Sequence, residues 1–252
     1  MPPFDQTPDK PQSFGYKISW YAVKAAAPGA VLDALEFGEG APANWRTGLA
    51  AAHSREGKAP ERYVFAAPPV SGWTLVAGFW LPEPYIPSQG PRDGSKFEEL
   101  FTGLMNRFAR VQFFGSYRVV DYCAWARAEN GKVVRIFSCA DGEVYANLGE
   151  QTPEEARLNF ARLDGLAPPE ATRRLYEAAE DIEAEQNALI AGGVPEREAQ
   201  AKVSRMRRAL PNESDVVELA GLWSVDPTQL SEQDNPEGLG LVARIPEKYS
   251  LI

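Results

Sequence analysis

Two dipeptides, Asn130-Gly131 and Asp141-Gly142, constrain the fold of this chain more than any other feature. They separate three runs with the composition of β-strands, at residues 117–128, 132–140 and 143–147. Asn-Gly and Asp-Gly readily supply the positive φ angles of a type I′ turn, which joins neighbouring antiparallel strands. The sequence therefore predicts an antiparallel meander in this region.

The segment before the meander alternates expected strands with expected helices. Alternating or β-rich patterns predict strands at residues 16–24, 62–67, 73–80 and 110–114. Apolar stripes predict a helix from Pro28, a short helix containing Trp45, and a longer helix over residues 96–109. This order predicts an α+β fold, an antiparallel sheet with helices on one face.

The pattern changes at Thr152, where Thr152-Pro153-Glu154-Glu155 is a typical helix start. Helices are expected at residues 168–191, 195–210 and 213–223, with no strand as far as residue 230. We therefore expect a C-terminal all-helical region. The expected organisation is a flexible N-terminal arm (1–14), a sheet domain (15–150), a helical region (151–230) and an irregular tail (231–252).

Charge and hydropathy limit the classes of partner. The net charge of −9 and the pI of about 4.9 disfavour binding to nucleic acid and favour a basic protein partner. The N-terminus lacks the basic and apolar segments of a signal peptide, and no apolar run approaches the ~20 residues that span a bilayer. These features favour a cytoplasmic protein without membrane contact; its oligomeric state is left open.

The two cysteines can be placed by extending the meander from its first turn. A two-residue turn at Asn130-Gly131 pairs Cys123 with Ser138 if the register is regular. The side chains of Cys123 and Cys139 would then leave opposite faces of the hairpin. We therefore expect two free thiols that cannot form a disulfide.

Motifs for catalysis, cofactors and metals are weak throughout the chain. His53 is the only histidine, and its neighbours suggest a helix-surface residue rather than a general base. The glycines do not match a dinucleotide or phosphate-binding loop. We expect no cofactor, no metal and no assigned catalytic residue.

Two sets of residues remain as candidate sites. The first is a partner-binding surface in and beside a proline-rich loop, formed by Trp80, Tyr85 and Ile86. The second is a sheet-lined cleft in which Asp121, expected in the middle of a strand, lies near arginines; these are Arg118, Arg127 and Arg135. The basic run 202–208 is expected to pair with the acidic stretch 177–185 on neighbouring helices.

Three segments, FGYKISWYAV, PPVSGWTLVAG and GLWSVDPTQL, resemble parts of uncharacterised bacterial proteins. The resemblance extends over most of the chain and implies no site residue. Our leading hypothesis is a non-enzymatic, cytoplasmic protein-binding module, in a specific form an immunity-type protein that neutralises a basic toxin or enzyme. The alternatives are an enzyme or small-molecule binder that uses the Asp121 cleft, and a structural subunit of a bacterial assembly.

Overall fold

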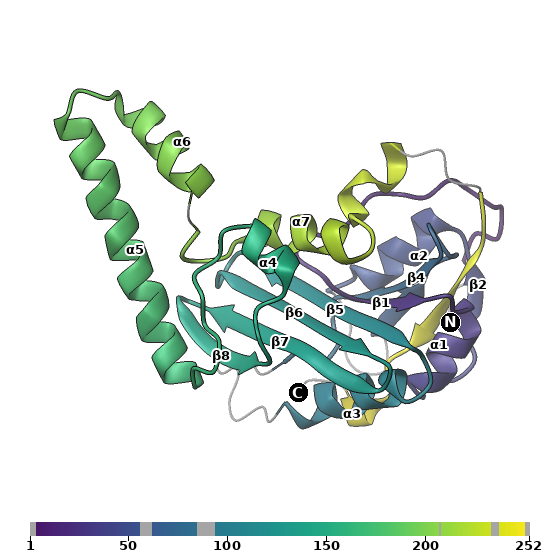
Figure 1. The fold of residues 1–252 in the computed structure, drawn as a ribbon. Helices are drawn as coiled ribbons and strands as arrows, with labels where there is room; N and C mark the ends of the chain where they lie inside the picture. The colour runs from purple at the N-terminus through teal and green to yellow at the C-terminus, as the bar shows by residue number, and fades with distance from the viewer. Residues whose placement is uncertain (1–3, 56–61, 85–93, 207, 233–236, 250–252) are drawn as a thin grey trace.

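The computed structural model describes residues 4–55, 62–84, 94–206, 208–232 and 237–249 (Figure 1). Its strands are β1 (Ser19–Lys24), β2 (Ala41–Ala43), β3 (Tyr63–Ala66), β4 (Trp73–Gly78), β5 (Arg110–Tyr117), β6 (Tyr122–Glu129), β7 (Lys132–Ala140), β8 (Glu143–Leu148) and β9 (Gly240–Arg244). The helices are α1 (Pro28–Ala34), α2 (Trp45–Ala52), α3 (Ser95–Met105), α4 (Pro153–Arg157), α5 (Pro168–Ala191), α6 (Glu196–Met206) and α7 (Glu213–Trp223).

The described strands form one antiparallel sheet in the order β2-β9-β3-β4-β1-β5-β6-β7-β8. Strands β5 to β8 are the expected meander. Both turn dipeptides have positive φ at each residue, 50° and 74° at Asn130-Gly131 and 49° and 79° at Asp141-Gly142. The prediction of an α+β fold built on an antiparallel meander is confirmed.

Helices cover both faces of the sheet, so the expectation of helices on one face only is wrong. One face packs Trp20 and Phe114 against residues of α2, α5 and α7. The opposite face packs Tyr21 and Phe113 against α1 and α3. Adjacent strand residues that are both large and apolar require cover on both sides of the sheet. Figure 1 shows the sheet lying between these two layers.

The register of β6 and β7 differs from the regular one and corrects the prediction for the cysteines. Ala128 pairs with Val133 but Arg127 pairs with Arg135, so Val134 is the extra residue of a β-bulge. Beyond the bulge, Cys123 pairs directly with Cys139. Both thiols are free and buried, but they lie on the same face of the hairpin.

Both ends of the described chain are tied to the body of the fold. The expected irregular tail contains β9, which lies between β2 and β3, with Val64 opposite Ala243. The expected flexible arm is held by Asp9, whose carboxylate accepts hydrogen bonds from the N–H groups of Trp45 and Arg46 at 2.6 and 3.1 Å. These bonds cap the first turn of α2.

Most helix boundaries follow the sequence, but α6 ends at Met206 and not at residue 210 as expected. A capping box of Thr152 and Glu155 begins α4, and α5 and α7 cover the residues expected for them. The expectation of an all-helical region is met only in part, because α5 and α7 pack on the sheet and a parallel bridge joins Phe160 to Arg208. In Figure 1, α5 and α6 project from the body as a hairpin. None of the described helices combines the length and apolar character needed to cross a bilayer.

Candidate functional site

A cleft of about 490 Å³ lies between α5 and the segment that follows α4. The α5 wall is formed by residues spaced as one side of a helix; these are Arg174, Ala178, Asp181 and Ile182. The opposite wall comes from the 151–161 segment and from Arg208. The cleft is therefore bounded by a long helix on one side, and by α4 with the irregular backbone around it on the other.

The first turns of α5 are fixed to the sheet, and this attachment positions the cleft wall. Ala171 and Leu175 are buried against the sheet. The hydroxyl of Thr172 accepts a hydrogen bond of 2.9 Å from the Val144 N–H on the edge strand β8. The remainder of α5 continues beyond these contacts and contributes Asp181 and Ile182 to the cleft.

The opposite wall is held by backbone hydrogen bonds between two segments that are distant in sequence. The Arg208 N–H donates to the Asn159 carbonyl at 2.9 Å, and the Ala161 N–H donates to the Arg208 carbonyl at 3.1 Å. The Arg208 guanidinium pairs with Asp215 and, at 3.0 Å, with Glu218. Burial raises the pKa of the Asp215 carboxyl above its ordinary value, although the hydrogen bond at Asn212 and the Arg208 charge oppose that rise.

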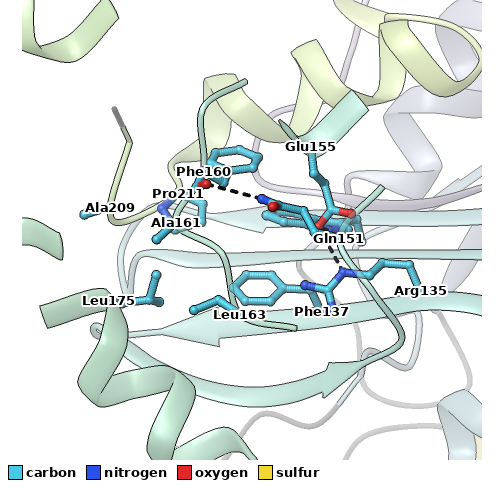
Figure 2. Close-up of a pocket in the computed structure, with 11 residues that line it drawn as sticks. Arg135, Phe137, Gln151, Glu155, Phe160, Ala161, Leu163, Leu175, Ala209 and Pro211 are labelled. Carbon is cyan, nitrogen blue, oxygen red and sulfur yellow. Dashed lines mark hydrogen bonds and ion pairs between the residues drawn. The ribbon is translucent and has the colours of Figure 1, made fainter. Parts of the chain in front are cut away.

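An aromatic pocket lies next to the cleft (Figure 2). The ring of Trp125 stacks between Phe137 and Phe160, with centroid distances of 4.5 and 5.4 Å. Phe160 lines both the pocket and the cleft. The lining of the cleft therefore combines one aromatic ring, Phe160, with aliphatic, amide and charged side chains.

A buried ion pair connects this pocket to the sheet and to α4. Glu155 is 1% exposed and accepts hydrogen bonds from Arg135 at 3.0 Å, Trp125 at 2.9 Å and the Thr152 N–H at 2.8 Å. Arg135 also donates to Asn147 at 2.7 Å. Because its oxygens are occupied by these donors, Glu155 holds α4 on β6 and β7 rather than serving as a free base.

The first set of predicted site residues lies elsewhere. Trp80 is partly buried; its indole N–H donates to the Ser54 carbonyl at 3.0 Å, and the Arg62 guanidinium lies 4.1 Å from its ring centroid. Tyr85 and Ile86 lie outside the described residues. Trp80 does not line the cleft beside α5.

The second set is dispersed. Asp121, expected in the middle of a strand, lies in the exposed turn between β5 and β6 with a φ of 46°, so that expectation is wrong. Arg127 is six residues further along, about 20 Å at the rise of a strand. Arg127 and Arg135 are cross-strand neighbours, but each is paired with its own glutamates. Arg118 lies 3.8 Å from Glu213.

The sequence did not identify most of the cleft. Leu175 and Ile182 lie seven residues apart on α5, a spacing typical of a helix-packing seam. No sequence pattern indicated that Asn159 and Phe160 form the opposite wall of the cleft. The expected pairing of the basic run with α5 is also wrong at Arg208, which turns to α7.

Among the described residues, no group of three or more histidine, cysteine, aspartate or glutamate side chains is arranged to hold a metal ion. Searches against protein-family models, curated proteins and solved structures gave no match.

Proposed function

We propose that this chain is a non-enzymatic, cytoplasmic protein-binding module, and that α5 and its cleft receive a basic segment of another protein. The observation that carries the proposal is the charge of α5. From residue 175 to Ala191 the helix has no basic residue and five acidic ones; these are Glu177, Glu180, Asp181, Glu183 and Glu185.

Most of these carboxylates have no counter-charge within the described chain. Only Glu177 is paired, through Arg173 and Arg174 at 3.7 and 3.9 Å. The second arginine of the cleft, Arg208, is neutralised by Asp215 and Glu218. Helix α5 and the ion-pair cluster of Arg208 together are therefore net negative, which favours a cationic partner and accelerates its encounter.

The shape of the site supports a polypeptide occupant. Ile182 and Phe160 offer apolar contact inside the cleft, and the carboxylate of Asp181 belongs to the same lining. The other acidic residues of this set lie on the same helix, α5. Apolar contacts combined with charged groups are common in protein interfaces. The specific form we propose is an immunity-type protein whose acidic helix covers a basic surface of a toxin or enzyme.

The test begins with capture of partners from a lysate of the native host, followed by cross-linking to locate the contact on the chain. Association kinetics are then compared for two double variants with the same change in net charge. Glu180→Lys with Asp181→Lys should slow association at least tenfold at low salt, because it reverses the charge on α5. The control, Asp33→Lys with Glu39→Lys, reverses two exposed carboxylates that lie outside the cleft.

Equal slowing by both variants would mean that only the net charge matters, and the assignment to α5 would be wrong. A cleft of this volume is also within the range of small-ligand sites. Absence of any cross-linked protein, together with a small molecule that raises the Tm of the wild type but not that of Ile182→Ala, would replace the proposal with small-molecule binding.

A further inference from the structure

Three direct cross-strand pairs follow one another along β6 and β7 on a single face of the sheet. They are Cys123 with Cys139, Trp125 with Phe137, and Arg127 with Arg135. The last two pairs belong to the aromatic pocket and its ion pairs, whereas the thiols have no role in the proposed function. Both cysteines are free, and they are 1% and 3% exposed.

The geometry of this pairing is compatible with a covalent bond. Directly opposed residues of an antiparallel pair have Cα atoms ~4.5–5.5 Å apart, within the range of disulfides, and their Cβ atoms need only a small approach. We propose that Cys123 and Cys139 are a redox-sensitive pair whose oxidation to a disulfide fixes β6 and β7 in their bulged register. This inference is independent of the proposed function.

The bulge gives the disulfide a specific consequence. In a regular hairpin from the Asn130-Gly131 turn, Cys123 would face Ser138, and the two thiols would leave opposite faces. Only with Val134 as the extra residue does Cys123 face Cys139. The oxidised hairpin therefore cannot slip by one residue, whereas in the reduced hairpin only packing resists the slip.

The chemical step balances with hydrogen peroxide as oxidant. One thiol attacks a peroxide oxygen and becomes a sulfenic acid, and water is released. The second thiol attacks the sulfenic sulfur, the S–S bond forms, and a second water leaves. The thiols lose two electrons and two protons in total, which the O–O bond takes up. A low-molecular-weight thiol reverses the step by exchange, and its disulfide can also serve as oxidant.

The surroundings of the pair make oxidation slow in the closed protein. The neighbouring Cys139 thiol and burial raise the pKa of the Cys123 thiol well above its ordinary value, and the charges of Asp215 and Asp121 add to the rise. Helix α7 packs on β5 and β6 on this face. The oxidant therefore reaches the pair when this packing opens locally, so oxidation reports the opening of α7.

The test uses the full chain in glutathione buffers of increasing oxidised fraction, with urea below the unfolding transition so that local opening is frequent. Equilibrium is approached from reduced and from oxidised protein. Intact-mass measurement should show that the protein has lost two hydrogens and carries no covalently bound glutathione. The oxidised protein should melt on the order of 5–10 °C above the reduced protein, because the loop 123–139 is closed in the unfolded chain.

Oxidation should also accelerate with urea, since it requires opening. Cys123→Ser and Cys139→Ser should each abolish the shift in Tm, and the comparison of oxidised with reduced wild type does not depend on these variants folding. Three results would overturn the inference. They are two free thiols in the most oxidising buffer, mixed or intermolecular disulfides in place of the internal one, and a disulfide form that melts no higher than the reduced form.

Discussion

The buried carboxylate Glu155 offers the sharpest test of how the helical part is attached to the sheet. Glu155→Ala removes the partner of Arg135, a buried acceptor for the Trp125 indole N–H, and one half of the capping box of α4. Loss of one member of a buried ion pair costs about 3–5 kcal/mol, since the remaining charge stays buried. The other donors to Glu155 bring the expectation to the upper part of that range, about 4–5 kcal/mol.

The remaining hydrogen bonds of Arg135 reduce the free-energy cost of Glu155→Ala but do not remove it. Its guanidinium still donates to Asn147 and to the carbonyl of Leu148, but those acceptors carry no full charge. The assay is urea unfolding followed by tryptophan fluorescence, with the slope of the free energy against urea checked for constancy. Thermal melting should show a decrease in Tm on the order of 10 °C for a chain of this size.

Glu154 is the matched control, because it is the neighbour of Glu155 on α4 and also pairs with an arginine. Its bond to Arg127 is 3.3 Å long, and both side chains are about one quarter exposed. Glu154→Ala should therefore cost less than about 1 kcal/mol. A double variant, Glu155→Ala with Arg135→Met, should be less destabilised than the sum of its single variants. Equal losses for Glu154→Ala and Glu155→Ala would refute the argument that the buried pair attaches α4.

Two further predictions concern the backbone and the pH dependence. Gly149→Ala should lower the free energy of unfolding by more than about 3 kcal/mol, because its Cβ would lie 2.0 Å from the Val134 carbonyl of the bulge. Gly165→Ala is the control, because Gly165 has a φ of 70° and an added Cβ would meet no atom within 4 Å. This variant carries only the cost of a positive φ and should lose about 1 kcal/mol of unfolding free energy. Similar losses for the two variants in urea unfolding would disprove the clash at Gly149. The hydrogen bond from the Gln151 N–H lowers the pKa of Asp164, so its contribution to stability is present at neutral pH and is lost as pH falls below about 4. Asp164→Asn should thus weaken the acid-induced decrease in Tm, and an unchanged pH profile would contradict this.

Helix boundaries in this chain could be predicted because local chemistry determines them. Thr152 and Glu155 bond each other's backbone at the start of α4, and Pro168 opens α5, so neither limit depends on distant residues. The type I′ turns are equally local, since Asn130 and Gly131 supply the required φ angles themselves.

Features that depend on distant contacts could not be predicted in the same way. The turn at residues 118–121 contains Val119 and Val120, whose preference for strands concealed it. The bulge at Val134 depends on a close approach by Gly149, which no hairpin rule contains. The cleft forms only where α5 faces Asn159 and Arg208. These two residues are distant in sequence and are brought together at the parallel β-bridge between Phe160 and Arg208.

The position of β9 has a consequence for how this fold is acquired during synthesis. The meander of β5 to β8 joins neighbours in sequence and can pair as soon as it has emerged from the ribosome. Strand β9 pairs Val242 with both Ala41 and Phe65, so β2 and one edge of β3 remain unpaired until nearly the whole described chain has been made. Until then β3 presents an unpaired edge, the kind of surface that recruits other strands. A chain cut before residue 240 should therefore keep that edge open permanently and aggregate through it.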